Sequence, residues 1–353
     1  MRGTPGGLAG AALCGLACLA MVAAVAPPGP GASPVPPAAP SERRPLQRLN
    51  GKLGVQGPGY SIVRDANGGE IVVEVRNGGK ALRLSYQPPD DLEATVETSV
   101  ELIADPPSFV YSYRLANSPT SRQRATDLAV ELVGAARSIA SPPGWDAKML
   151  TSISALAWSS SSGLAAGGTA AGFAFTGYDH DDTETLDTPA GVLPGFVHPR
   201  GSLPGIVSCY VVGSARLPAA LSTPASALVP VVAALPRFPR NGVAGKTVGP
   251  VEAPAENQLP RVLAALRQYA KASLELGWIE RRDTADRYAR ALAAVDGSYS
   301  GGDPARRSHL VLQLQAIENQ VDVDSRRREL KPEAYALLKY NSWWLRRWVS
   351  EQR

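Results

Sequence analysis

The chain has 353 residues with 34 glycines and 31 prolines, and its formal net charge is only +4. This length predicts one to three domains. The low net charge gives little support for a polyanion partner. No stretch interleaves aromatic and basic residues as single-strand grooves do, so we expect no nucleic-acid partner.

The N-terminus has the pattern of an export signal. Arg2 precedes an uncharged apolar run, Leu8–Ala26, that is rich in small residues. Residues 1–26 are therefore predicted to be a signal peptide or, if they stay uncut, an N-terminal anchor just long enough to cross a bilayer. We expect a secreted, periplasmic or cell-envelope protein with no membrane span after cleavage. Residues 27–45 are mostly Pro, Ala, Gly and Ser, which predicts a disordered spacer.

Residues 46–237 change to a period of two. Ala81–Tyr86 and Ala94–Leu102 alternate apolar with polar side chains, and the turn signal Pro88-Pro89-Asp90 separates the two runs. Short strands with turns about every ten residues indicate an antiparallel β-sandwich. Further strands are expected at Phe109–Leu115, Ala129–Val133, Ala155–Trp158, Gly172–Gly177 and Ile206–Val212.

Cys209 is the one cysteine that follows the predicted signal peptide. A disulfide framework within the mature chain is therefore excluded. Its strand-like surroundings favour a small buried hydrophobic residue over a nucleophile.

After this strand, Gly245, Gly249 and Pro250 interrupt any regular pattern, so residues 238–256 are predicted to be a linker between domains.

Residues 257–353 are predicted to form a small four-helix bundle, so the chain as a whole is expected to be a multidomain α+β protein. Four stretches carry one-sided helical patterns with matching start and stop signals. The first stretch repeats apolar residues from Leu259 to Ala270 and stops at Gly277. The second begins at Asp283, the third at Asp303-Pro304 and the fourth at Lys331-Pro332.

Three tryptophans fall near the end of the fourth helix. Trp343 and Trp344 differ by about 100° around a helix, so one face cannot bury both of them. We expect one of the pair to pack on the β-domain, which would make a helix-to-sheet interface. The alternative is a basic-aromatic patch, joined by Arg326–Arg328, for an anionic polymer or lipid head groups.

An acidic segment is the best candidate for a metal site. Asp179, Asp181, Asp182 and Glu184 lie within six positions, and Ca²⁺ prefers several oxygen ligands on a flexible loop. The alternative is a solvated acidic loop. A glycosidase pair that includes Asp182 and Glu184 is conceivable, but that mechanism needs a fixed separation of two carboxyl groups. No nucleophile elbow, zinc motif or phosphate loop is present, so no catalytic residue is assigned.

The helical end resembles a known family. The runs Leu276–Ile279, Leu314–Val321 and Leu330–Leu338 are similar to those of FIMAH-type domains, small helical modules at the C-terminus of secreted or surface bacterial proteins. The resemblance covers about residues 257–350. It implies an extracellular accessory or interaction module and supplies no catalytic residues.

The β-rich part has a resemblance of its own. The segments Tyr111–Gln123, Ala171–Gly177 and Leu203–Gly213 are similar to an uncharacterised secreted β-domain of soil bacteria, which implies no activity. Together these features predict an exported, non-catalytic binding or scaffolding protein whose partner is an envelope protein or a polysaccharide. The alternatives are a hydrolase acting on an extracellular polymer and a calcium-binding interaction module.

Overall fold

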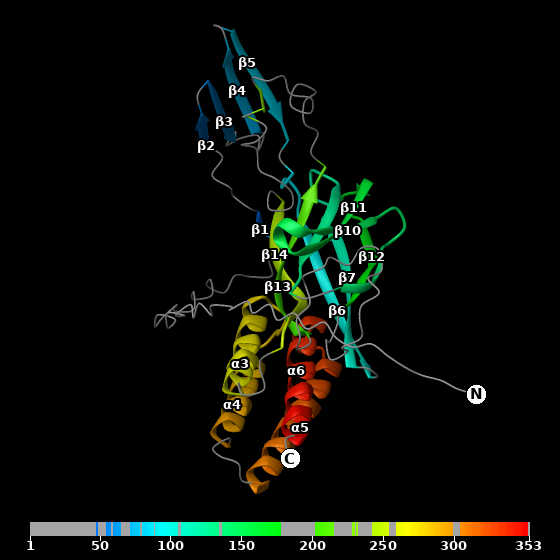
Figure 1. Ribbon diagram of the computed structural model, residues 1–353, viewed down its shortest axis with the longest axis vertical. Helices are drawn as coiled ribbons and strands as arrows, with labels where there is room; N and C mark the ends of the chain where they lie inside the picture. The colour runs from blue at the N-terminus through cyan, green and yellow to red at the C-terminus, as the bar shows by residue number, and fades with distance from the viewer. Residues whose placement is uncertain are drawn as a thin grey trace, which may run out of the picture. The chain divides into compact units, whose positions relative to one another are not determined.

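The computed structural model describes residues 47–48, 54–57, 59–64, 71–77, 80–87, 89–104, 107–133, 136–177, 202–214, 228–229, 231, 242–253, 259–298 and 304–351. These residues form antiparallel sheets followed by α-helices (Figure 1), which confirms the α+β class. The predicted signal peptide or anchor, 1–26, and the spacer, 27–45, lie outside the described residues.

The described strands form three antiparallel sheets. The largest has the order β1-β14-β13-β8-β11-β10, the second β6-β7-β12-β9 and the third β2-β3-β4-β5. The strands of the largest sheet are β1 (Gln47–Arg48), β8 (Ala125–Glu131), β10 (Asp146–Leu150), β11 (Ala155–Leu164), β13 (Ser202–Gly213) and β14 (Val243–Glu252). Those of the other two are β6 (Ala94–Ala104), β7 (Pro107–Asn117), β9 (Ala136–Ala140), β12 (Thr169–Gly177), β2 (Gly54–Gly57), β3 (Tyr60–Arg64), β4 (Ile71–Asn77) and β5 (Lys80–Tyr86). A short 3₁₀ helix, Thr151–Ile153, precedes β11.

Strand β14 corrects the prediction of a linker at 238–256. It pairs with β13 over its whole length, and Pro250 lies opposite Pro204 in this ladder. No described strand pairs with the other side of either proline, because β8 joins β13 only from Cys209 onward and β1 joins β14 only at Val243 and Ala244. On that side the carbonyl of Pro250 accepts a single hydrogen bond from the N–H of Val133 at 3.3 Å, and the carbonyl of Pro204 accepts one from the side-chain amide of Asn341. The missing N–H groups therefore cost no ladder hydrogen bond, and the Gly- and Pro-rich sequence can form a strand.

Trp158 joins the largest sheet to the second sheet. Its side chain, on β11, is fully buried. Its ring lies 6.1 Å from that of Tyr113, 5.6 Å from Phe173 and 6.4 Å from Phe175, and these three partners belong to β7 and β12. Its indole N–H donates to the carbonyl of Ala140, 2.9 Å away. Aromatic packing of this kind gives the two sheets a shared core.

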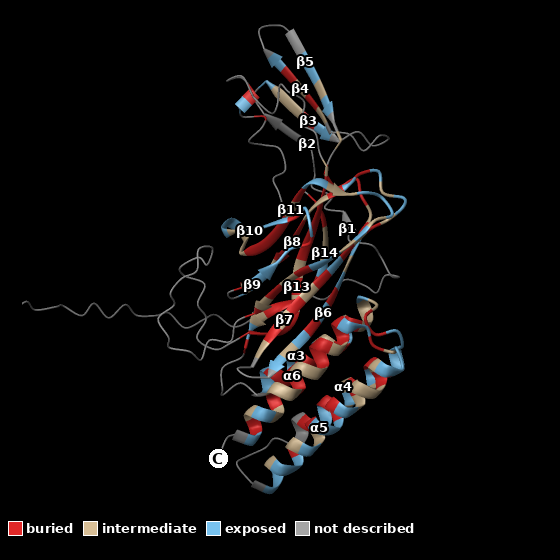
Figure 2. Cartoon of the chain, turned by 90° about the vertical axis from the view of Figure 1, so that its right-hand side faces the viewer, coloured by how far each residue is buried: buried red, intermediate tan, exposed pale blue. Residues whose placement is uncertain are grey.

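The four described helices, α3 (Leu259–Glu275), α4 (Arg282–Ser298), α5 (Pro304–Arg326) and α6 (Pro332–Glu351), lie side by side as two hairpins (Figure 1). The first residue of each helix lies within one position of its predicted start, and α3 ends two residues before the predicted stop at Gly277. Each helix carries buried residues on one side and exposed residues on the other (Figure 2). In α5 the apolar stripe Leu310, Leu314, Ile317 and Val321 is buried.

Candidate functional site

The helix-ending glycine after α3 makes a Schellman cap. Gly277 has a positive φ of 69°. Its N–H donates to the carbonyl of Leu274 at 3.1 Å, and the N–H of Trp278 donates to the carbonyl of Ser273 at 2.7 Å. This pair of bonds satisfies the last carbonyls of a helix, and it returns the chain towards the core, where Trp278 is buried.

The end of α5 repeats this cap without a glycine. Arg328 occupies the position of Gly277, with a φ of 62°. Its N–H donates to the carbonyl of Ser325 at 2.9 Å, and that of Glu329 donates to the carbonyl of Asp324 at 3.0 Å. An arginine in this left-handed conformation carries a backbone cost that a glycine avoids.

The two loops that follow these caps pair with each other. Ile279 and Leu330 form an antiparallel bridge. The N–H of Lys331 donates to the carbonyl of Trp278 at 2.8 Å. The two helical hairpins are thus equivalent units that meet loop to loop.

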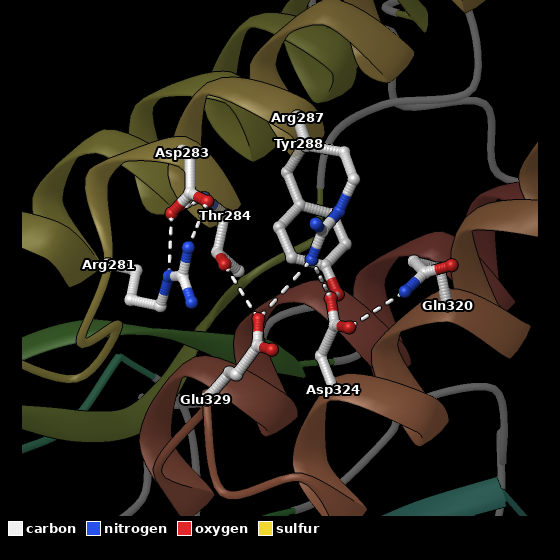
Figure 3. A network of polar contacts seen from close by, with 8 residues as sticks. All are labelled: Arg281, Asp283, Thr284, Arg287, Tyr288, Gln320, Asp324 and Glu329. Atoms are coloured by element: carbon white, nitrogen blue, oxygen red, sulfur yellow. Dashed lines mark hydrogen bonds and ion pairs between the residues drawn. The ribbon is translucent and has the colours of Figure 1, made fainter.

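A buried carboxylate lies beside this bridge (Figure 3). The side chain of Asp324 has no exposed surface. It accepts hydrogen bonds from Arg287 at 2.6 Å, from the hydroxyl of Tyr288 at 2.6 Å and from the amide of Gln320 at 2.7 Å. Burial, followed by the bond to Asp324, raises the pKa of Tyr288 well above its ordinary value, so this hydroxyl stays a donor. A buried charge is tolerated when donors surround it in this way.

Glu329 extends the network to the start of α4. Its carboxylate accepts from the hydroxyl of Thr284 at 2.7 Å and from Arg287 at 3.5 Å. Arg281 and Asp283 form a separate, exposed bidentate pair next to it (Figure 3). The network therefore ties α4 to α5 and to the loop that leads into α6, and its chemistry is that of a structural lock.

Helix α6 is bonded to open strand edges. Among the described strands, β6 is an edge of its sheet. The N–H of Thr98 on this edge donates to Glu333 at 2.7 Å, and the hydroxyl of Tyr340 donates to the carbonyl of Val100 at 2.9 Å. Side chains that occupy edge groups protect a sheet from pairing with other strands.

The other sheet is reached by the next residue of α6. Asn341 is buried, and its amide donates to the carbonyl of Pro204 on β13 at 2.9 Å. The ring of Tyr340 also packs 5.4 Å from that of Phe109 on β7. The expected interface between the helix and the sheets therefore exists. Its described hydrogen bonds and ring contact are made by Glu333, Tyr340 and Asn341, and not by the tryptophans.

The tryptophans themselves lie farther along α6. Trp343, Trp344 and Trp348 pack against the core but remain partly exposed. The rings of Trp344 and Trp348 are nearly parallel, with an interplanar angle of 9° and centroids 6.3 Å apart. The guanidinium of Arg347 lies 5.8 Å from the centroid of the Trp343 ring. We call these four residues the tryptophan surface.

Cys209 lies on β13 and is buried, as expected. Burial raises the pKa of its thiol to about 12, so the thiolate that would act as a nucleophile is disfavoured.

The predicted calcium residues Asp179, Asp181, Asp182 and Glu184 lie outside the described residues, and so does the carboxylate pair of the hydrolase alternative. Within the described ranges, no three His, Cys, Asp or Glu side chains come together as a metal site would require. Among the described helices, none combines the length and the apolar character that a membrane span requires. Arg326, Arg327 and Arg328 are exposed.

The sequence did not identify Asp324, Arg287 or Glu333 as site residues. Asp324 bonds to Arg287 and Tyr288, 37 and 36 positions away, and Glu333 bonds to Thr98, 235 positions away, although Gln320 lies only 4 positions from Asp324. The available signal was weak: Asp324 falls three positions after Val321 on the stripe of α5. The helical spacing of the fourth helix does place Asn341 on the same face as its apolar residues, and the structure buries this side chain with a hydrogen-bond partner, the carbonyl of Pro204. No family model, curated protein or solved structure was found to match the chain.

Proposed function

We propose that this chain is an exported, non-catalytic binding protein of the cell envelope, and that the tryptophan surface of α6 binds an envelope polysaccharide. The partly exposed, parallel rings of Trp344 and Trp348 carry this proposal. Tryptophan offers a large rigid apolar face beside a polar N–H, and such side chains dominate binding surfaces. The apolar C–H faces of sugar rings pack on aromatic faces of this kind.

The rest of the fold supports this role as a scaffold. We propose that the largest and second sheets form a β-sandwich and that α3–α6 form a four-helix bundle of the FIMAH type. Glu333, Tyr340 and Asn341 hold α6 against strand edges of both sheets. A helix that is fixed at three points presents its aromatic rings with little loss of conformational entropy on binding.

Cosedimentation of the full-length protein with purified peptidoglycan tests the proposal. We expect the wild-type protein to enter the pellet. The double variant Trp344→Ala/Trp348→Ala should bind at least about tenfold more weakly, because truncating aromatic anchors removes most of the contact energy.

Leu312→Ala is the matched control, since Leu312 is an apolar residue of α5 that is 63% exposed. It should pellet like the wild type. Equal pelleting of the folded double variant would contradict the proposed surface. If the wild-type protein stays in the supernatant and an envelope protein captures it instead, the polysaccharide proposal is contradicted and the partner is a protein.

A further inference from the structure

The first turn of α6 places a carboxyl group inside the interface with β6. Glu333 is only 2% exposed. One of its oxygens, Oε1, accepts from the N–H of Thr98 at 2.7 Å. The other, Oε2, is buried and has no hydrogen-bond partner among the residues that the structure describes. A carboxylate normally accepts several hydrogen bonds when it is charged and buried, so this site holds the charged form poorly.

The groups around Glu333 do not supply the hydrogen bonds that its carboxylate lacks. The hydroxyls of Thr98 and Thr247 are hydrogen-bonded to each other. Lys331, just before α6, favours the charged form, whereas Glu97 on β6 opposes it. The side chain of Glu97 is itself 65% exposed, and its carboxylate lies 3.5 Å from the guanidinium of Arg114. Solvent and this neighbouring positive charge weaken the repulsion between Glu97 and Glu333.

Burial has the largest effect on the pKa of Glu333. It raises the pKa of Glu333 above the ordinary glutamate value, against the opposing effects of the N–H groups of Thr98 and Glu333 itself and of Lys331, while Glu97 adds to the rise.

We propose that Glu333 is a proton-operated latch between α6 and β6, in which the neutral carboxyl group keeps the helix docked and its ionisation loosens the helix. When α6 leaves the strand, water solvates the carboxylate, so the open state favours the charged form. This regulation lies beyond the proposed binding role and does not depend on which ligand the protein takes.

The direction of the pH dependence follows from linkage. The docked state has the higher pKa, so it binds more protons than the open state over the interval between the two pKa values. The stabilisation by the neutral group is fully present below the ordinary glutamate pKa. It is lost as the pH rises through the raised pKa of the docked state.

Hydrogen exchange of the full-length protein, measured by mass spectrometry between pH 4 and pH 8 and corrected for intrinsic exchange, tests the latch. We expect the opening equilibrium of peptides from β6 and the first turns of α6 to rise about tenfold per pH unit between the two pKa values. The variant Glu333→Gln keeps the shape of the side chain but cannot ionise. Its opening equilibrium should not change over the same range.

Tyr340→Phe is the matched control, because it removes the bond to Val100 without removing the ionisable carboxyl group. It should raise the opening equilibrium by a similar factor at every pH and keep the wild-type slope. A pH-independent wild type, or a Glu333→Gln variant with the wild-type slope, would overturn the proposal. If Glu333→Gln does not fold, the carboxyl ¹³C titration of Glu333 in the wild type decides: a midpoint at or below that of an ordinary glutamate contradicts the latch, and a higher midpoint supports it.

Discussion

Replacing Asp324 with alanine is expected to lower the free energy of unfolding by about 3 kcal/mol or more, since removing one partner of a buried charged pair costs roughly 3–5 kcal/mol. The variant leaves Arg287, the hydroxyl of Tyr288 and the amide of Gln320 without their shared acceptor. Arg287 is 41% exposed and can turn to water, which holds the expected loss to the lower end of that range. Tyr288 is buried and cannot do so.

Urea denaturation followed by helical circular dichroism measures this loss. Asp283→Ala is the matched control, because it removes a carboxylate from the exposed pair with Arg281 in the same region (Figure 3). Exposed pairs contribute little to stability, so its effect should be much smaller. Equal effects of the two substitutions would show that the lock between α4 and α5 does not depend on Asp324.

Replacing Trp158 with alanine is expected to destabilise the protein by about 3–5 kcal/mol, the range for truncating a buried large aromatic residue. The substitution removes the ring that contacts Tyr113, Phe173 and Phe175 across two sheets. It also leaves the carbonyl of Ala140 without its indole donor. The cavity would open in the shared core, where the surrounding strands can collapse only in part.

Thermal and chemical unfolding followed by near-UV circular dichroism report on this core. Trp158→Phe is the matched comparison, since it keeps an aromatic ring and loses the indole N–H. The free energy of unfolding should fall clearly less for Trp158→Phe than for Trp158→Ala. A loss below about 1 kcal/mol for Trp158→Ala, the typical value of one hydrogen bond, would mean that the two sheets do not share this core.

The helices were predictable because local signals define them. Gly277 after α3 and Pro332 at the start of α6 act through their own backbone geometry, which the sequence displays directly. The strands with clean alternation, such as β6, were predictable for the same reason. β14 was not, because its Gly- and Pro-rich sequence becomes a strand only through its pairing with β13.

The candidate site was predictable only in part. The tryptophans near the end of the fourth helix and the conflict between Trp343 and Trp344 follow from helical geometry alone. Glu333 could not be found in this way, because its partner Thr98 lies 235 positions earlier in the chain. The matching cap at Arg328 was also missed, since an arginine gives no sign of a left-handed backbone.

Oxidative footprinting of the full-length protein, with and without peptidoglycan, tests the proposed binding surface most directly. Mass spectrometry would follow the oxidation of each tryptophan. We predict that the ligand protects Trp344 and Trp348, while the oxidation of the buried Trp158 stays low in both samples. Unchanged oxidation of Trp344 and Trp348 in a sample that demonstrably binds peptidoglycan would contradict the proposal that α6 carries the binding surface.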